Sequence, residues 1–327
     1  MVFSVIGFGF KAAFILILSV IIIGFTYEHI SRPIAESNFP PQGEFVEVDG
    51  HKLHYVKKGE AGPTVVFESG LDPGGHLPWF KVQNEISKYA TTVSYDRAGI
   101  LWSDRGNNPK TGKAIVKELH SLLNEGGFNK PYILVGHSLA GLTLRSFISE
   151  YPEDISGIVF VDAGHPDQIN RMSAELRSIN QPPPIWLIKL ANSIGIMRVF
   201  GKYTYSNTGK SDFISIQSNK LAFKGYSAVL EEQNNVYSLF DEAGQITSFG
   251  DIPLLVITSS SPVQHNQLPN EELRKELFNI LNDLQNDLLN LSSNSEQIFA
   301  SKSGHYIQLD QPEIVVAAIK EMISKTE

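Results

Sequence analysis

Short apolar runs rich in β-branched residues alternate with segments of helical spacing along most of this chain. Strands are predicted at residues 45–48, 52–56, 64–68, 91–95, 132–135, 158–161, 254–257 and 297–300, and helices at residues 79–89, 113–124, 139–151, 271–291 and 312–323. Apolar strands that alternate with helices form a parallel sheet covered on both faces. We therefore predict an α/β fold with a mostly parallel, doubly wound sheet. The first two strands flank Asp49-Gly50, which predicts an antiparallel hairpin at one edge.

One connection is too long for a plain crossover. About 90 residues separate the sixth and seventh predicted strands, and an insertion of that size is usually functional. We interpret it as a helical cap over the strand ends. The expected organisation is an N-terminal segment at residues 1–30, a polar, proline-bearing linker at residues 31–43, a first core part at residues 44–164, a cap at residues 165–250 and a second core part at residues 251–327.

The N-terminal segment has the length and composition of a membrane helix. Residues 12–27 carry no charge, and Lys11 is the single charged residue before Glu28. Counted from Val5 to Tyr27, a helix would be roughly 34 Å long, enough to cross a ~30 Å hydrocarbon core. A single-pass anchor and a cleaved signal peptide both fit, although no small-residue cleavage site precedes Ser31. The charges slightly favour an extracytoplasmic main body, which would be secreted if the segment is cleaved.

Composition excludes several classes of protein. The chain has 27 Lys and Arg against 35 Asp and Glu, a formal net charge of −8, which argues against a nucleic-acid partner. It has no cysteine, which excludes a disulfide scaffold, a thiolate zinc site and a cysteine nucleophile. No metal-ligand spacing, dinucleotide motif or phosphate loop is present, so neither a metal nor a cofactor is expected. The oligomeric state is left open.

The strongest chemical motif surrounds one serine. Gly136-His137-Ser138-Leu139-Ala140 follows a predicted strand and opens a predicted helix. A serine on such a sharp turn needs small residues two positions before and after it, because the backbone there approaches its neighbours closely. The turn exposes the hydroxyl above the sheet and places the amide of Leu139 at a helix N-terminus, where it can meet a developing oxyanion.

Together these features resemble a serine hydrolase of the α/β-hydrolase family, from about Phe45 to the C-terminus. The sequence around Tyr95-Asp96-Arg97 is similar to the family turn after the fourth strand, and the sequence from Ser303 to Pro312 is similar to its closing histidine motif. The resemblance implies that Ser138 is the nucleophile and that His305 is the general base. It also implies a cap inserted between strands 6 and 7.

The acid of the expected triad departs from the common family pattern. Most members carry an aspartate after the strand equivalent to residues 254–257, but residues 258–266 contain no carboxylate. Asp251 lies at the wrong end of that strand, since ligand sites form at carboxyl ends. Asp162 stands at the carboxyl end of the preceding strand, where some members carry the acid. We assign Asp162 to orient His305; the alternative is a helix-capping or cap-anchoring aspartate.

The resemblance also suggests the remaining site residues. The second oxyanion donor should be the N–H of Leu71, in a loop where Ser69 replaces the usual histidine. Gly70 and, from the cap, Trp186 are the expected substrate contacts. The apolar stretches at residues 185–190 and 194–197 either wall an acyl pocket or form ordinary cap core.

The function predicted from the sequence is therefore hydrolysis of an acyl bond in a small apolar substrate, with a carboxylic ester as the leading class. A Ser-His-Asp triad, an acyl-enzyme and a backbone oxyanion hole would perform it. A serine in place of an aspartate nucleophile argues against epoxide and haloalkane chemistry. The alternatives are a ligand-binding protein without turnover, suggested by the missing carboxylate, and a peptidase or cofactor-free peroxidase with the same triad.

Overall fold

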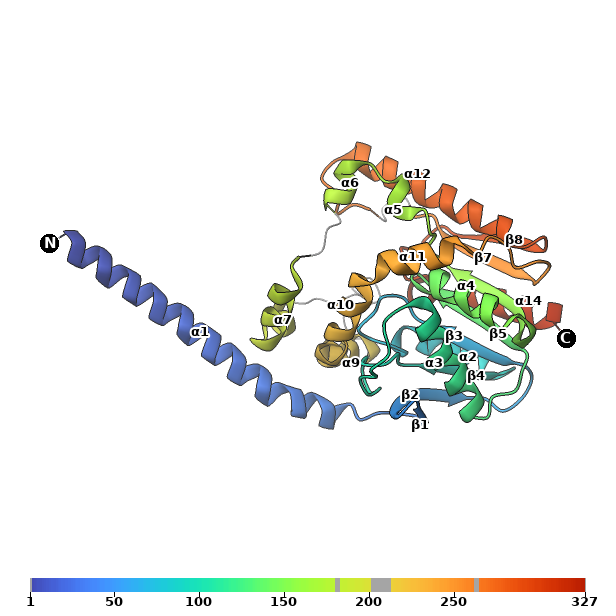
Figure 1. The fold of residues 1–327 in the computed structure, drawn as a ribbon, viewed down its shortest axis with the longest axis horizontal. Helices are drawn as coiled ribbons and strands as arrows, with labels where there is room; N and C mark the ends of the chain where they lie inside the picture. Colours follow the sequence, from blue (N-terminus) through green and yellow to red (C-terminus); the bar gives the residue numbers. More distant parts are fainter. Residues whose placement is uncertain (1, 180–182, 201–212, 262–264, 327) are drawn as a thin grey trace.

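One mixed sheet forms the centre of the protein. The computed structural model describes residues 2–179, 183–200, 213–261 and 265–326 (Figure 1). The strands are β1 (Glu44–Val48), β2 (His51–Lys58), β3 (Thr64–Glu68), β4 (Thr91–Tyr95), β5 (Tyr132–His137), β6 (Ile155–Val161), β7 (Leu254–Ser259) and β8 (Ser295–Ala300). Their order in the sheet is β1-β2-β4-β3-β5-β6-β7-β8. The β1–β2 and β2–β4 pairs are antiparallel and the other pairs are parallel. The predicted mostly parallel sheet with an edge hairpin is confirmed.

Helices cover both faces of this sheet. The helices of the core are α2 (Phe80–Ile86), α3 (Gly112–Glu125), α4 (Ala140–Glu150), α12 (Glu271–Leu288), α13 (Ile307–Asp310) and α14 (Pro312–Thr326). Successive side chains of a strand point to opposite faces. Leu134 accordingly packs in one buried cluster with residues of α3 and α4, whereas Ile133 packs in a second cluster with residues of α2 and α14. The sheet is therefore doubly wound, as predicted.

The chain between β6 and β7 forms the predicted helical insertion, here called the cap. Its described helices are α5 (Gln168–Arg171), α6 (Ala174–Ile179), α7 (Ile185–Ser193), α8 (Ile196–Phe200), α9 (Phe213–Leu221), α10 (Tyr226–Asn234) and α11 (Val236–Gly244); residues 180–182 and 201–212 lie outside the described part. Leu239 and Ala243 of α11 are buried in one cluster with Leu139 and Leu142. The cap therefore reaches the turn that carries Ser138.

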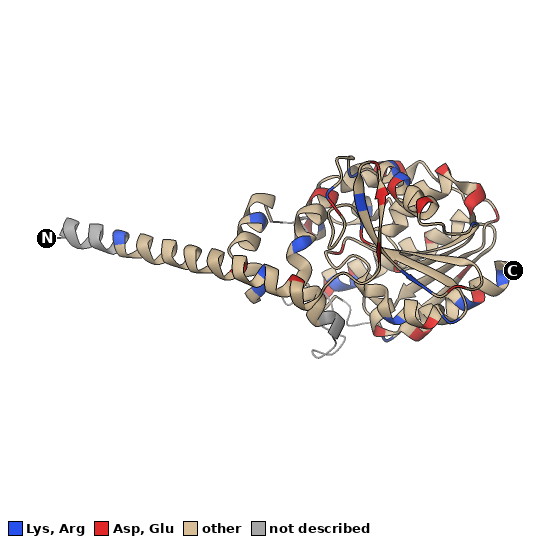
Figure 2. Cartoon of the chain, turned by 90° about the horizontal axis from the view of Figure 1, so that it is seen from below, with Lys and Arg blue, Asp and Glu red and all other residues tan. Residues whose placement is uncertain are grey.

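The N-terminal helix, α1 (Val2–Asn38), projects from the body as a single rod (Figure 1). Figure 2 shows no charged residue along it between Lys11 and the part nearest the body. Its large apolar side chains between Phe14 and Ile34 are exposed, from 37% at Ile21 to 68% at Ile23. Among the described residues, Lys11–Asn38 is the one helix long and apolar enough to cross a membrane, by length and composition alone.

The predicted linker at residues 31–43 is wrong over its first part, because α1 continues to Asn38. The reason is tertiary contact with the cap. The carboxylate of Glu28 is 1% exposed and lies 2.6 Å from Nε of Arg198 on α8. One turn from the helix end, Ala35 is buried in a cluster with residues of the cap and of the core. Polar composition and a proline suggest a linker, but these contacts stabilise the helical conformation.

Replacing Glu28 by Ala should loosen the docking of α1 on the cap, because the Arg198 guanidinium, 6% exposed, would lose its carboxylate. Removing one partner of a buried ion pair costs about 3–5 kcal/mol. We expect faster amide hydrogen exchange in the second half of α1 and in α8. The matched control is Glu36→Ala. Glu36 also lies on α1, but its ion pair with Lys224 of the cap is more exposed, so its loss should change amide hydrogen exchange little. Equal exchange in the two variants would contradict this.

Candidate active site

Ser138 lies in the sharp turn between β5 and α4. Its φ of +55° is in the left-handed region, which is strained for a residue other than glycine. The turn is also crowded, because a Cβ at position 136 would lie 2.5 Å from Cδ1 of Leu144 and 2.9 Å from Cβ of Ala140. This crowding is the reason for the small residues that flank the serine. The turn holds the hydroxyl at the carboxyl end of β5.

His305 lies in the loop between β8 and α13 and contacts two residues that are distant in sequence. Its Nε2 is 2.8 Å from Oγ of Ser138, and its Nδ1 is 2.6 Å from Oδ2 of Asp162. The imidazole is 45% exposed, whereas the carboxylate is 11% exposed. An imidazole that joins a hydroxyl to a carboxylate has the geometry to accept a proton from the hydroxyl and to be held in one tautomer by the acid.

Asp162 follows β6 directly and is fixed from the neighbouring strand. Its N–H donates to the carbonyl of Ile257 at 2.8 Å, and its Oδ1 accepts the N–H of Ser259 at 3.0 Å. Because β6 and β7 are parallel neighbours, their carboxyl ends meet at one edge of the sheet. An acid after β6 therefore reaches His305 without a carboxylate after β7. The end of β7 contributes a backbone donor to the acid instead.

The two predicted oxyanion donors are on segments that adjoin Ser138. Leu139 follows the serine and opens α4, so its N–H lies at the positive end of a helix dipole. The Gly70–Leu71 segment follows β3, the parallel neighbour of β5. A Cβ at position 70 would lie 2.8 Å from Cβ of Ser138, so this loop rests directly against the serine and requires glycine there. Donation by Leu71 and Leu139 to an oxyanion stays a prediction.

A buried histidine holds the loop of His305 in place. Nε2 of His137 lies 2.8 Å from the backbone oxygen of His305. Burial, together with the nearby charge of His305, holds the pKa of His137 well below its usual range. The ring is therefore neutral, and its Nε2–H donates to that carbonyl.

A second tie joins the loop of His305 to the loop after β3. The hydroxyl of Tyr306 donates to Oδ2 of Asp72 at 3.1 Å, and Oδ1 of Asp72 accepts the N–H of Gly74 at 2.6 Å. Sequence reasoning missed this pair, because 234 positions separate its members. The position of Tyr306 directly after the predicted base was the only signal available.

His54, His76 and Asp96 form the one group of possible metal ligands found in the described part of the chain, with ligand atoms within 4.8 Å of one another. Each oxygen of Asp96 already lies 2.8 Å from Nδ1 of one of the two histidines. Burial raises the pKa of Asp96, but the two imidazoles outweigh it and hold that pKa well below its usual range. The group is thus a satisfied hydrogen-bond network that ties β2, β4 and the loop after β3 together.

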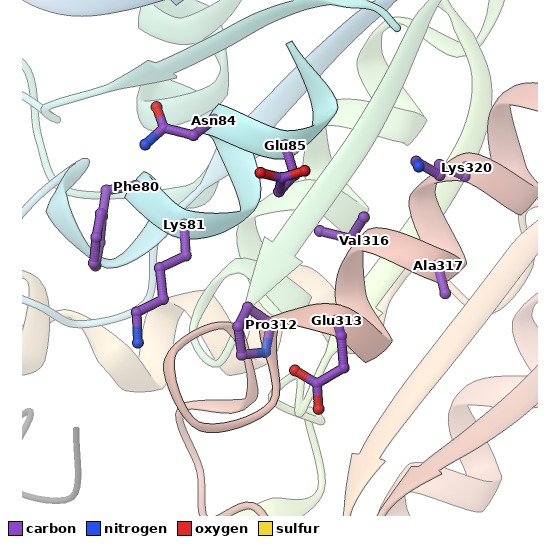
Figure 3. Close-up of a pocket in the computed structure, with 9 residues that line it drawn as sticks. All are labelled: Phe80, Lys81, Asn84, Glu85, Pro312, Glu313, Val316, Ala317 and Lys320. Carbon is purple, nitrogen blue, oxygen red and sulfur yellow. The ribbon is translucent and has the colours of Figure 1, made fainter. Parts of the chain in front are cut away.

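The sites suggested by surface shape and by the cap sequence lie elsewhere. A surface pocket of about 640 Å³ opens between α2 and α14 (Figure 3), and its lining contains none of the predicted site residues. It is lined by Phe80, Lys81, Asn84, Glu85, Pro312, Glu313, Val316, Ala317 and Lys320. Trp186 lies on α7 and is 67% exposed. In Figure 1, α7 lies beside α1, and a substrate contact by Trp186 stays a prediction.

Known proteins share this sequence and architecture. Residues 63–190 match the model of the family described as alpha/beta hydrolase fold. YqjL of Bacillus subtilis, an uncharacterized protein, is 25% identical over 84% of this chain and 89% of its own length. YbdG of the same organism, also uncharacterized, is 29% identical, but the match spans only 48% of each protein.

A solved structure resembles the whole fold. The thermophilic esterase of Thermogutta terrifontis superimposes with a TM-score of 0.59 at 16% identity, over 87% of this chain and 99% of the esterase. The chain therefore has the α/β-hydrolase fold, and residues 63–190 match the model of that family.

Proposed function

We propose that this hydrolase-family protein is a serine hydrolase that cleaves an acyl bond, with carboxylic esters as the leading substrate class. One observation carries the proposal: a continuous hydrogen-bonded path runs from Oγ of Ser138 through His305 to the carboxylate of Asp162. The strained backbone of Ser138 supports it, because such strain persists where the surrounding structure demands it and is concentrated at functional sites.

The reaction follows from these contacts. Nε2 of His305 accepts the proton of the Ser138 hydroxyl as Oγ attacks the carbonyl carbon of the ester. Asp162 holds Nδ1–H and stabilises the imidazolium that forms. The oxyanion of the tetrahedral intermediate accepts the N–H groups of Leu139 and Leu71. The intermediate collapses to the acyl-enzyme, and the alcohol leaves with the proton from His305. Water, deprotonated by His305, then attacks the acyl carbon and releases the carboxylic acid and Ser138.

The main alternative was a binding protein that has lost turnover, because no carboxylate follows β7. The contact of Asp162 with Nδ1 of His305 weakens this alternative, since an acid is present at the required nitrogen. Nothing in the contacts of Ser138 favours a peptidase or a cofactor-free peroxidase over an esterase. The small apolar acyl substrate remains part of the proposal.

Asp162→Asn should lower ester turnover by about 10⁴-fold, because the amide favours the wrong tautomer of His305. Ser138→Ala and His305→Ala should abolish covalent labelling by a fluorophosphonate. Turnover of short p-nitrophenyl esters and mass-spectrometric mapping of the labelled peptide measure both. Asp251→Asn is the matched control, because it removes an exposed carboxylate at the other end of β7 and should leave turnover unchanged. Turnover of Asp162→Asn within a few-fold of wild type would exclude Asp162 as the acid.

The apolar part of α1 is a membrane anchor in this proposal, with the main body outside the cytoplasm. Two features support an anchor that stays attached. The apolar surface is exposed along the projecting helix (Figure 2), whereas Glu28 near its base is buried against the cap. Cleavage beyond Glu28, for example directly before Ser31, would leave Arg198 buried without its carboxylate, which is unfavourable.

The cap also presents an apolar surface beside the anchor. Of the eleven exposed large hydrophobic residues described outside α1, six lie on α7, α8 and α9: Trp186, Leu187, Leu190, Ile196, Val199 and Ile216. Gly24 of α1 packs so closely on Ile194, between α7 and α8, that a Cβ there would lie 2.4 Å from its carbonyl oxygen. This surface therefore continues that of α1 and, in the proposal, contacts the lipid headgroup boundary.

Trp186 provides a direct test of the lipid contact. In vesicles containing brominated phospholipid, tryptophan fluorescence of the full chain should be quenched, and Trp186→Phe should remove the quenching. Trp79 is fully buried and Trp102 is half-buried against the cluster that contains Ala35, so both should contribute little to the quenching. The matched control adds Tyr237→Trp to Trp186→Phe, which places an exposed tryptophan on α11, away from α1, and should add emission that the brominated lipid does not quench. Equal quenching of wild type and Trp186→Phe would contradict the contact.

A further inference from the structure

We propose that Arg97 is a positioning residue for the oxyanion hole and that Glu232 makes its position depend on the cap. The inference rests on the proposed function, since it assigns a role to residues behind the Leu71 donor. Arg97 lies in the turn after β4, and Glu232 lies on cap helix α10; they are 135 positions apart. Together they connect the cap to the loop that lies against Ser138.

Every N–H of the Arg97 guanidinium is used. Nε and Nη2 donate to the two oxygens of Glu232 at 2.9 and 2.8 Å, and Nη1 donates to Glu68 at 2.7 Å. The two remaining N–H groups donate to backbone carbonyls, of Ser69 and of Gly70, each at 2.6 Å. The guanidinium is 4% exposed and both carboxylates are buried. Such charge-assisted, bidentate bonds fix an orientation strongly.

The bond to Gly70 aims the proposed oxyanion donor. The carbonyl of Gly70 and the N–H of Leu71 belong to one peptide group, which is trans. In a trans peptide these two groups point in opposite directions. With its carbonyl bound to Arg97, the peptide directs the N–H of Leu71 away from Arg97. The positive charge of the guanidinium bound to this carbonyl also polarises the peptide group, which makes the N–H of Leu71 a better donor.

The cap packs on the same loop and on the turn of Arg97. A Cβ at Gly225, at the start of α10, would lie 2.7 Å from the carbonyl oxygen of Pro73, two residues after Leu71. A Cβ at Gly99 would lie 3.0 Å from Cβ of Ala228, one turn before Glu232. Because α10 lies on both segments, a shift of the cap would move Glu232 relative to Arg97. Without Glu232, the Arg97 guanidinium would be held by the carboxylate of Glu68 alone, and it would fix the orientation of the Gly70 carbonyl less strongly.

The first experiment compares Arg97→Lys with wild type. Lysine keeps the charge but cannot reach Glu232 and both carbonyls in one fixed geometry. Removing one oxyanion donor costs about 10²–10³-fold in kcat. A donor that is present but poorly oriented should therefore lower kcat by a smaller factor, about 10–100-fold. We expect that loss in kcat for a p-nitrophenyl ester with little change in KM. Affinity for a boronic acid that forms a tetrahedral adduct on Ser138 should fall by the same factor, while affinity for the carboxylate product stays constant.

A merely structural role would not separate these two affinities. Equal losses for the boronic acid and for the carboxylate product would therefore overturn the role of Arg97. Thermal unfolding of each variant, followed by circular dichroism, identifies the fraction folded, to which kcat is normalised. Should Arg97→Lys not fold, the Glu232 variants described next make the same comparison of affinities.

The cap dependence is tested with two adjacent carboxylates of α10. Glu232→Gln removes the negative charge that pairs with Arg97. Glu231→Gln also removes one negative charge, but that charge pairs with the exposed Arg105. We expect a loss of about tenfold in kcat and in boronic acid affinity for Glu232→Gln and no loss for Glu231→Gln. Equal behaviour of the two variants would overturn the coupling. Failure of the proposed function gives a different result, because wild type would then show no turnover, or turnover would persist in Ser138→Ala.

Discussion

The parallel pairing of β3, β5, β6 and β7 is the constraint on which the site depends. In this register Phe67, Val135 and Val159 lie side by side across the sheet, so the four strands end at one edge. The loop of Gly70 and Leu71, the serine turn and Asp162 each follow one of these ends, and the donor Ser259 is the last residue of β7. Antiparallel pairing of any neighbouring two strands would move one of these groups to the opposite edge, out of reach of the others.

Burial of charge organises the loops at that edge. Asp96 and Arg97 are adjacent in sequence, are both almost fully buried and bind different partners. A buried ion is unfavourable unless it is paired and hydrogen-bonded. Asp96 therefore binds two histidines, and Arg97 binds Glu68, Glu232 and two carbonyls. The need to satisfy these two side chains fixes the loop after β3, and with it the backbone beside Ser138.

The cap contacts three parts of the protein that differ in chemistry. Its helix α11 packs on the serine turn through apolar side chains, and α10 reaches Arg97 through Glu232. On its outer side, α8 binds Glu28 of α1. A movement of the cap would therefore change contacts at the loop of Gly70 and at the base of α1 together. This arrangement gives a physical route of contacts from α1 through the cap to the loops beside Ser138.

The sequence by itself determined the sheet, its edge hairpin and the position of the cap, because strand–helix alternation and turn residues are local signals. It also indicated Ser138 through the small residues at positions 136 and 140, and the structure gives the reason in the crowding of the turn. The contact of Asp162 with His305 was anticipated from the strand end on which Asp162 lies. Its catalytic role, like those of Ser138, His305, Leu71 and Leu139, stays a prediction.

Only the tertiary structure decided the remaining features. The helix through residues 31–38, the exposure of Trp186 and the ties made by Tyr306 and Glu232 depend on partners far away in the chain. Local propensity predicts a linker for the polar, proline-bearing residues 31–38, whereas buried contacts with the cap keep these residues helical. A side chain that pairs across 135 or 234 positions leaves no local pattern, because the sequence records which residues exist and folding brings them together.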